Sequence, residues 1–362
     1  MIQQNISLKK FNTFGVDVYA KQFSTFQSVE ELQEILQNLK PQTSNLKPQT
    51  SNLKPHTSNL KSQTYILGGG SNILFTKNID GTVLKNEITG IEKINEDAEY
   101  VFIRAGAGEN WHVFVEYCLN NNYAGVENLA LIPGNVGASP MQNIGAYGVE
   151  IKDVFESLEA FDMEKNELKT FHKADCGFGY RESVFKNKYK GRFIITSVTF
   201  RLLKKPVFNT SYGAIEEELE KMNAGITIQN IAQAVINIRT SKLPDPKVIG
   251  NAGSFFKNPE ISNELHQNLK NKFPGIIGYD LSNGNVKLAA GWLIEQCGWK
   301  GYRKGDAGCH SKQALVLVNY GNASGNDIIE MSTRIIESVD KRFGLLLERE
   351  VNVIPPHHPS PI

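Results

Sequence analysis

One serine in the sequence lies in a setting that could support chemistry. Ser254, in the stretch GNAGSFFKNP (residues 250–259), follows a run of small residues and precedes two phenylalanines. It could act as a nucleophile, act as a hydrogen-bond or proton donor, or simply belong to a turn. The sequence NAGSF is not the G-x-S-x-G elbow of serine hydrolases, and no motif places a His/Asp pair. Because serines after glycine are mostly turn or cap residues, the residue by itself leaves these roles open.

Two glycine-rich stretches have the composition of phosphate-binding loops. The first, GGGSN (residues 68–72), follows an apolar run, and consecutive glycines can point several N–H groups toward one anion. The second spans residues 127–148, is nearly uncharged, and contains small residues that permit close backbone approach to a ligand. Neither matches the G-x-G-x-x-G or Walker A pattern. Each could be only a chain-reversing turn, but two together favour a dinucleotide-sized ligand.

The cysteines and histidines do not form a metal-binding pattern. No C-x-x-C pair is present, so we expect reduced thiols rather than disulfides or a zinc site at Cys118, Cys176, Cys297 and Cys309. The histidines lack metal-ligand spacing, and we predict no metal at His112, His172, His266, His310 or the tail pair His357–His358.

Charge and length exclude several classes of partner. The 362 residues include 39 basic and 38 acidic side chains, for a net charge of +1. This balance predicts neither a nucleic-acid partner nor a membrane-surface partner. No apolar run approaches the ~18 residues of a membrane span, and the first residues lack the apolar core of a signal peptide. We therefore expect a cytoplasmic protein of two or three domains.

Apolar periodicity predicts three clear helices. Ser28 and Glu31 have the spacing of a capping box, and the apolar residues from Val29 to Leu39 share one helical face. Similar spacing predicts a helix over residues 111–119. A third helix is predicted over residues 326–343, ending at Gly344.

Other segments read as strands. Residues 65–75 predict a strand, a glycine turn and a second apolar strand, and residues 313–319 predict another strand. In residues 192–202 an alternating pattern predicts a half-buried strand with one apolar face, formed by Ile194, Val198, Phe200 and Leu202. Helices and strands mix without strict βαβ alternation, which predicts an α+β fold.

Residues 38–64 repeat the unit NLKPQTS with small variations. The recurring prolines Pro41, Pro48 and Pro55 exclude a continuous helix, and one leucine per unit cannot support a core. We predict a disordered insertion that lengthens a helix-to-strand connection.

Several long motifs occur in a recognisable order. They are NTFGVDVYA, GGGSN, NLALIPGNVGASPMQNIGAYGVE, CGFGYRESVFK, SKLPDPKVIGNAGSFFKNP, VKLAAGWLIEQCGWKG and LEREV. Together they resemble the UDP-N-acetylenolpyruvoylglucosamine reductases, flavoenzymes of peptidoglycan precursor synthesis, over about residues 5–354. TSYGA (residues 210–214) resembles the form of the family with a tyrosine loop over the substrate. The repeat and the proline-rich tail depart from the family pattern.

The resemblance implies an α+β fold of the FAD-binding, vanillyl-alcohol-oxidase-like (PCMH) type. It implies flavin-binding lobes over residues 1–84 and 85–240, a substrate-binding domain over 241–354, and a flexible tail over 355–362. NADPH would reduce the FAD. No histidine lies in either glycine loop, so non-covalent FAD is expected. The implied flavin contacts are Gly68, Gly69, Gly70, Ser71, Asn72, Pro133, Gly134, Gly137, Ala138, Ser139, Asn143, Gly145, Ala146, Tyr147 and Gly148.

The implied reaction converts the enolpyruvyl ether of UDP-N-acetylglucosamine enolpyruvate to the lactyl ether of UDP-N-acetylmuramate. Hydride attack at C3 of the vinyl ether pushes electrons onto the carboxylate at C2, and this charge must be stabilised before C2 is protonated. By resemblance, Arg181 lies beside that carboxylate, Ser254 donates the proton, and Glu350 is the C-terminal active-site glutamate. A guanidinium fork suits such a carboxylate.

The resemblance also implies substrate contacts and leaves two alternatives. The implied contacts with the UDP-sugar are Tyr212, Lys242, Asn258, Tyr279, Lys287 and Gln313, and we expect a monomer. One alternative is a flavin oxidase of the same superfamily, and another is a non-catalytic protein that binds flavin or a nucleotide sugar. The ordered motifs and the presence of all three catalytic positions argue against both.

Overall fold

A computed structural model describes residues 1–39, 64–211 and 214–355. The backbone divides into two compact units, which we describe separately. Unit 1 comprises residues 1–6, 20–69 and 79–238, and unit 2 comprises residues 7–19, 70–78 and 239–362. The proposed lobes and substrate domain stay a prediction. Most of the 38–64 repeat and of the 355–362 tail lies outside the described residues.

The first sheet of unit 1 is largely parallel. Its order is β1-β2-β5-β3, and both β2 and β3 run parallel to β5. The strands are β1 (Gln3–Ser7), β2 (Tyr19–Phe26), β3 (Thr64–Leu67) and β5 (Ile79–Asn86). The predicted helix is confirmed as α1 (Val29–Leu39). Its capping box is only half formed: the Ser28 hydroxyl accepts from the N–H of Glu31 at 3.2 Å, but the Glu31 carboxylate accepts from Gln27 instead of Ser28.

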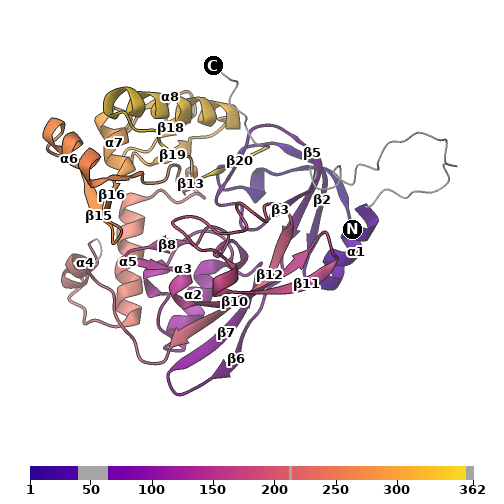
Figure 1. The fold of residues 1–362 in the computed structure, drawn as a ribbon. Coiled ribbons are helices and arrows are strands. Elements are labelled where there is room, and N and C mark those ends of the chain that lie inside the picture. The colour runs from indigo at the N-terminus through magenta and orange to yellow at the C-terminus, as the bar shows by residue number, and fades with distance from the viewer. Residues whose placement is uncertain (40–63, 212–213, 356–362) are drawn as a thin grey trace. The chain divides into compact units, whose positions relative to one another are not determined.

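The second sheet of unit 1 is antiparallel, with the order β11-β10-β12-β7-β6 (Figure 1). An aromatic cluster of Trp111, Phe114 and Phe200 lies in its core. The strands are β6 (Ile91–Glu96), β7 (Tyr100–Gly106), β10 (Phe155–Asp162), β11 (Glu167–His172) and β12 (Phe193–Leu203). The remaining elements are α2 (Trp111–Asn120), β8 (Gly145–Ala146), β9 (Val149–Glu150), α3 (Ile151–Val154), α4 (Ile215–Lys221) and α5 (Ile228–Lys242), which continues into unit 2.

Strand β12 differs from its prediction in one respect. A strand is present, but it is buried along most of its length instead of on one face. Its register with β10 shifts between the pairs Glu159–Ser197 and Ala160–Ile195, so that Thr196 forms a β-bulge. The bulge reverses the alternation: Val198, Phe200 and Leu202 join the main core, whereas Ile194 packs in a separate cluster containing Phe26 and Leu32.

The described part of unit 2 contains two small sheets, a parallel strand pair and three α-helices that lie wholly within it. The sheets have the orders β13-β19-β18-β17 and β14-β16-β15, and β4 pairs with β20. Their strands are β4 (Ile73–Phe75), β13 (Gly250–Ser254), β14 (Glu260–Ser262), β15 (Gly278–Asp280), β16 (Asn285–Leu288), β17 (Arg303–Lys304), β18 (Ala307–Cys309), β19 (Val316–Asn319) and β20 (Asn352–Ile354). The helices are α6 (Asn263–Lys272), α7 (Ala290–Gln296) and α8 (Gly325–Phe343).

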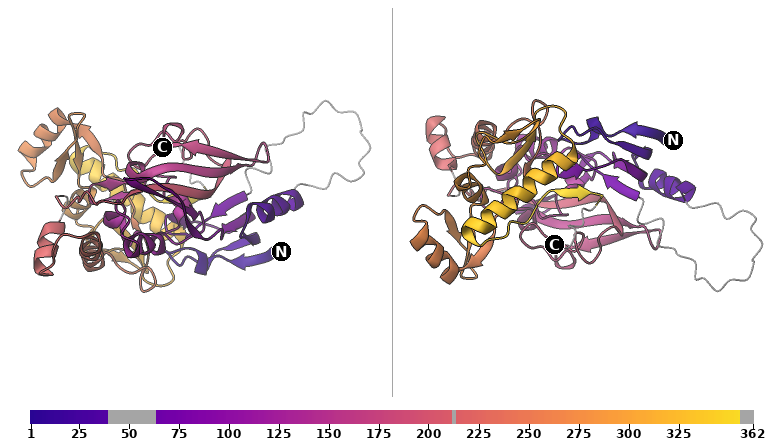
Figure 2. Two further views of the ribbon diagram at one scale, coloured as in Figure 1. Left: turned by 90° about the horizontal axis from the view of Figure 1, so that it is seen from below. Right: turned by 90° about the horizontal axis from the view of Figure 1, so that it is seen from above.

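The long helix α8, yellow in Figure 2, packs against β18 and β19. It confirms the predicted C-terminal helix: Ser324 and Asp327 form a capping box, and Gly344 ends it in the left-handed conformation. The predicted strands at 65–75 and 313–319 are confirmed as β3, β4 and β19, and the mixed order confirms an α+β fold. Within the described ranges, no helix is long and apolar enough to cross a membrane.

A buried ion pair in unit 1 gives a stability prediction. Asp162 is 1% exposed. Arg192 donates to it through Nε at 3.1 Å and through Nη2 at 2.6 Å. Burial alone would raise the pKa of Asp162, but the hydrogen bonds from Arg192 and the backbone of Lys165 outweigh it and hold the pKa below its usual value.

We therefore expect Asp162→Asn to lower the free energy of unfolding by about 2 kcal/mol at pH 7. A lowered carboxyl pKa stabilises the fold above the pKa of the unfolded chain, so this difference should shrink as the pH falls below about 4. Urea melts at several pH values would measure it. Asp80→Asn, which removes an exposed ion pair with Lys21, is the matched control and should change little. Equal effects of the two variants would contradict the prediction.

Candidate active site

In unit 1 the two glycine-rich stretches lie against each other. A Cβ atom on Gly69 would lie 2.7 Å from Asn135 Oδ1 and 2.9 Å from Gly134 Cα. A Cβ atom on Gly137 would lie 2.5 Å from the Cβ of Ala107. Only glycine permits these approaches, so the two loops form a closely packed backbone cradle. The structure therefore brings two predicted cofactor residues, Gly69 of the first loop and Gly134 of the second, next to each other, and such a cradle fits a pyrophosphate-bearing cofactor.

The polar side chains of the second loop shape the loop itself. Ser139 is buried and donates to the carbonyl of Val136 at 2.7 Å. Asn143 is fully buried, and its Nδ2 donates to Glu150 at 3.1 Å and to the carbonyl of Gly179 at 3.0 Å. Because both amide hydrogens are used internally, the Asn143 side chain has no donor left for a ligand. Its predicted contact with the flavin, which stays a prediction, would have to come from another group.

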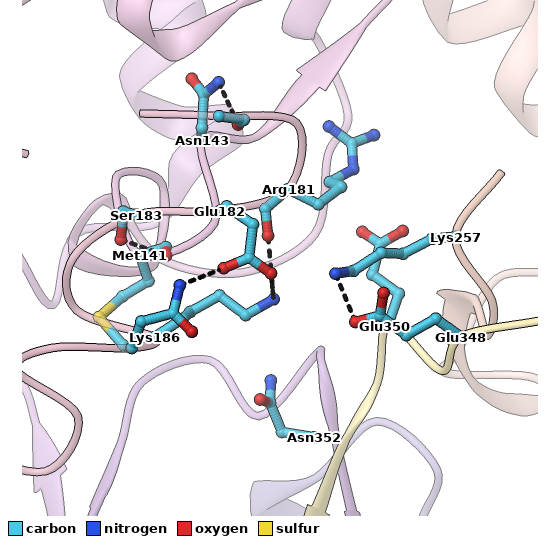
Figure 3. Close-up of polar contacts among 12 residues, drawn as sticks. Met141, Asn143, Arg181, Glu182, Ser183, Lys186, Lys257, Glu348, Glu350 and Asn352 are labelled. Atoms are coloured by element: carbon cyan, nitrogen blue, oxygen red, sulfur yellow. Dashed lines mark hydrogen bonds and ion pairs between the residues drawn. The ribbon is translucent and has the colours of Figure 1, made fainter. Parts of the chain in front are cut away.

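Arg181 is held in a specific orientation beside this loop. The residue is left-handed, with φ of 55°, in a tight turn closed by two backbone hydrogen bonds between Gly179 and Glu182. Arg181 Nη2 donates to the carbonyl of Gly145 at 2.7 Å. The Lys186 ammonium donates to the backbone carbonyl of Arg181 at 3.0 Å (Figure 3). A left-handed conformation is strained for a long side chain, and strained residues of this kind are enriched at functional sites. The structure thus places the predicted arginine against Gly145.

Asn128 supports the same loop and was not among the predicted site residues. It is buried, and its amide donates to the carbonyls of Tyr147 at 2.9 Å and Asn209 at 2.8 Å. It fixes Tyr147, which is left-handed with φ of 49°. Asn128 is the first residue of the motif NLALIPGNVGASPMQNIGAYGVE, but the spacing of residues in the sequence could not identify either of its hydrogen-bond partners.

In unit 2, the end of the first glycine loop is tied to the C-terminal strand. Gly70 is left-handed, and a Cβ atom on it would lie 2.0 Å from the carbonyl oxygen of Phe11. The carbonyl of Asn72 accepts from both the N–H and Nδ2 of Asn352, at 3.1 and 3.0 Å. The Asn72 Nδ2 donates to the carbonyl of Glu350 at 3.4 Å. Predicted cofactor and catalytic residues are therefore linked within this unit.

Strand β13 positions Ser254 through a β-bulge. Asn251 pairs with Val318 and Ser254 pairs with Val316, which leaves one additional residue on β13. Gly253, which lies within this bulge, adopts the left-handed conformation. The buried Asn251, another residue missed by sequence reasoning, accepts from the N–H of Gly253 at 2.9 Å and donates to the carbonyls of Pro244 and Ile249. The bulge sets the direction in which Ser254 leaves the strand.

Glu350 lies on the segment next to β13. Its N–H donates to the carbonyl of Phe255, the residue after Ser254, at 2.8 Å. The N–H of Lys257 donates to the carbonyl of Glu348 at 2.9 Å, and their side chains form a 2.6 Å ion pair (Figure 3). Two of the three predicted catalytic residues are therefore on paired segments of unit 2, whereas Arg181 belongs to unit 1.

The predicted substrate residues fall into three groups. Tyr279 and Lys287 face each other across β15 and β16, so their side chains share one face of that sheet. Asn258 Oδ1 accepts from the N–H of Ala290 at 3.0 Å, and Gln313 Oε1 accepts from the N–H of Leu315 at 3.3 Å. Lys242 is exposed at the end of α5. Tyr212 lies outside the described residues.

The cysteines offer no activated nucleophile. Burial raises the pKa of Cys118, and it raises the pKa of Cys176 and Cys309 to about 12. These thiols are therefore protonated at neutral pH and chemically inert. Among the described residues, no group of three histidine, cysteine, aspartate or glutamate side chains could hold a metal ion.

Sequence comparison identifies the class of protein first. Residues 58–171 match the FAD-binding domain family, and this range contains both glycine loops. The cradle at Gly69, Gly134 and Gly137 fits that assignment, so the chain is an FAD-dependent flavoprotein. Residues 245–354, which include Ser254 and Glu350, match the C-terminal domain of UDP-N-acetylenolpyruvoylglucosamine reductase.

Full-length relatives identify the family. A UDP-N-acetylenolpyruvoylglucosamine reductase of Flavobacterium johnsoniae is 50% identical over 98% of this chain and 99% of the relative. One from Amoebophilus asiaticus is 48% identical over 98% and 99%. The chain belongs to this reductase family. The crystal structure of the reductase from Thermus caldophilus, 24% identical, covers 98% of this chain and 100% of its own with a TM-score of 0.64, which shows the same fold.

Gly70 gives a prediction about the cofactor loop. Gly70→Ala would carry both the left-handed strain, about 1 kcal/mol, and a clash with the Phe11 carbonyl, so we expect protein purified without most of its flavin. The ratio of absorbance at 450 and 280 nm measures this. Gly15→Ala is the matched control because Gly15 is also left-handed but has nothing within 4 Å of its Cβ position. Full flavin content in Gly70→Ala would contradict the prediction.

Proposed function

We propose that this chain reduces UDP-N-acetylglucosamine enolpyruvate to UDP-N-acetylmuramate, with NADPH as reductant and non-covalently bound FAD as cofactor. Membership of the reductase family over nearly the whole chain carries this proposal. The placement of Ser254 beside the segment that bears Glu350 supports it. The reaction consumes two electrons and two protons, which together convert one carbon–carbon double bond to a single bond.

FAD, when bound, would supply a two-electron relay between NADPH and the double bond of the enolpyruvyl group. We propose that residues 68–72 and 133–148 hold its pyrophosphate and adjoining groups. Their contribution is backbone N–H groups and close approach, not charge. This is consistent with the uncharged composition of the second loop.

We propose that Arg181 stabilises the negative charge that develops on the substrate carboxylate. One arm of its guanidinium already donates to the carbonyl of Gly145, which fixes the plane of the group. A guanidinium whose orientation is set before the reaction stabilises the transition state without reorganisation. The left-handed backbone of Arg181, held between Gly179 and Glu182, costs conformational free energy, and we infer that this strain accompanies the placement of the guanidinium.

Ser254 would donate the proton to C2. A serine hydroxyl is a weak acid in water, but the electron-rich carbon formed by hydride addition is strongly basic, and a fixed donor in a dry site suffices. The bulge at Gly253 and the buried Asn251 fix the backbone from which the hydroxyl projects. Glu350 would polarise the substrate carboxylate from the neighbouring segment.

We further propose that Tyr279 and Lys287, with Lys242, Asn258, Gln313 and Tyr212, bind the UDP-sugar. A lysine ammonium is a compact charge suited to a diphosphate, and Tyr279 is 45% exposed next to Lys287 across the sheet. We also propose that the protein is a monomer. The use of NADPH and a nucleotide sugar supports a cytoplasmic location.

Anaerobic stopped-flow spectroscopy tests the function. NADPH should bleach the flavin absorbance near 450 nm, and the enolpyruvyl sugar should restore it with formation of UDP-N-acetylmuramate. Reoxidation by oxygen alone, with no product from the enolpyruvyl sugar, would instead indicate an oxidase. A flavin that NADPH does not reduce would indicate a binding protein.

Ser254→Ala tests the proposed proton donor. We expect unchanged reduction of the flavin by NADPH and a loss of product formation of about 100-fold or more, since general-acid catalysis contributes factors of this size. Ser262→Ala is the matched control: Ser262 caps α6 in the same unit, so its loss should lower stability but not the rate. Normal product formation by Ser254→Ala would refute the donor role.

A further inference from the structure

The segment that carries Glu350 has an unusual residue on its buried side. From Leu345 to Val351 burial alternates: Leu345, Leu347 and Val351 are at most 6% exposed, whereas Leu346 is 73% exposed. This is the period of an extended segment with one face inward. Arg349 occupies the remaining inward position, between Leu347 and Val351, where an aliphatic residue would fit the pattern.

The Arg349 guanidinium binds neutral groups of helix α8. Its Nε donates to the hydroxyl of Ser332 at 2.8 Å, and its Nη2 donates to the hydroxyl of Thr333 at 2.7 Å. No described carboxylate forms an ion pair with it, and burial lowers its pKa. A partly buried cation without an acidic partner is costly, so its presence here calls for a compensating role.

The two hydroxyls are oriented to receive this fork. Ser332, itself fully buried, donates its own proton to the carbonyl of Ile329 at 2.8 Å, and Thr333 donates to the same carbonyl at 3.0 Å. Each hydroxyl has a single proton, which is already donated to the Ile329 carbonyl. Toward Arg349, each hydroxyl oxygen can therefore only accept a hydrogen bond. The arrangement is therefore directional, and it fits a planar two-pronged donor better than a lysine.

This fork joins the Glu350 segment to α8 at one point. On its other sides the segment is held by the Phe255 carbonyl, by Asn72, and by the exposed end of the Lys257–Glu348 ion pair. Figure 3 shows Glu348 and Glu350 on the same segment, with Lys257 reaching Glu348. A backbone hydrogen bond fixes register, but the bidentate contact at residue 349 also fixes the rotation of the segment about its own axis.

We propose that Arg349 is a positioning residue that, through its bidentate contact with Ser332 and Thr333, sets the direction in which Glu350 projects. This proposal rests on the proposed function, in which Glu350 polarises the substrate carboxylate. Arg349 itself contacts no reacting atom. It acts through the neighbouring peptide unit.

The first experiment separates the two half-reactions. Arg349→Met, and independently the double variant Ser332→Ala/Thr333→Val, should slow product formation by about 10- to 100-fold, since small misplacements of catalytic groups have effects of this size. Flavin reduction by NADPH should stay within twofold of the wild type. Arg349→Lys should recover part of the rate, because a lysine can reach one hydroxyl.

Ser338→Ala is the matched control. Ser338 lies on the same helix and donates in the same way, to the carbonyl of Ile335 at 2.9 Å, but its oxygen accepts from Trp299 Nε1 instead of an arginine. We expect a lower melting temperature and no change in either half-reaction. If Ser332→Ala/Thr333→Val behaves like Ser338→Ala, the positioning role is wrong.

A double-mutant cycle tests whether Arg349 acts through Glu350. Once Glu350→Gln has removed the carboxylate, adding Arg349→Met should slow product formation no further. Rate losses that multiply would overturn the proposal, as would equal losses in both half-reactions. A wild-type protein that forms no UDP-N-acetylmuramate would instead refute the proposed function. If Arg349→Met does not fold, the double variant combined with Glu350→Gln completes the same cycle.

Discussion

The backbone hydrogen bond from Glu350 to the carbonyl of Phe255 is the contact on which the proposed catalytic part of unit 2 depends. It joins segments far apart in the sequence and fixes their register. Because Phe255 directly follows Ser254, that register decides where Ser254 stands relative to the Glu350 segment. The bulge at Gly253 then sets the direction of the serine, and buried Asn251 holds the bulge. Side chains of ordinary reactivity become useful here because the backbone leaves them little freedom.

Close backbone approaches extend this constraint to the cofactor loop. Gly250 and Gly325 each approach a backbone carbonyl of another segment. A Cβ atom on Gly250 would lie 2.2 Å from the carbonyl oxygen of Phe14, and one on Gly325 would lie 1.8 Å from the carbonyl oxygen of Phe75. Asn319 adds a hydrogen bond to the Phe14 carbonyl at 2.9 Å. These contacts explain why residues 7–19 and 70–78 fold with the C-terminal third of the chain. The loop end at Asn72 and the Glu350 segment therefore belong to one packed body.

The sequence predicts the elements whose signals are local. Helices α1, α2 and α8 and strand β19 follow from apolar spacing and caps. The reversal along β12 could not be predicted, since the bulge at Thr196 arises from pairing with β10 and leaves no mark in the local pattern. The same limit applies to the candidate site. The motifs predict Ser254 and Glu350 as site residues, which stays a prediction, whereas the contacts of Asn128, Asn251 and Arg349 involve partners distant in the chain. Sequence spacing contains no information about such partners.

The chemistry of the proposed reaction makes different demands on the groups of the proposed site. Groups that stabilise or protonate a reacting atom must be placed within about 0.5 Å, and Arg181 and the segments bearing Ser254 and Glu350 are accordingly held by backbone hydrogen bonds. A diphosphate tolerates more variation, because a long cationic side chain can follow it as a point charge. Lys287 and the exposed Tyr279 face each other on a short three-stranded sheet. In the proposed site, the reacting groups would thus be positioned by backbone contacts, whereas the diphosphate would be bound by the charge of a long side chain.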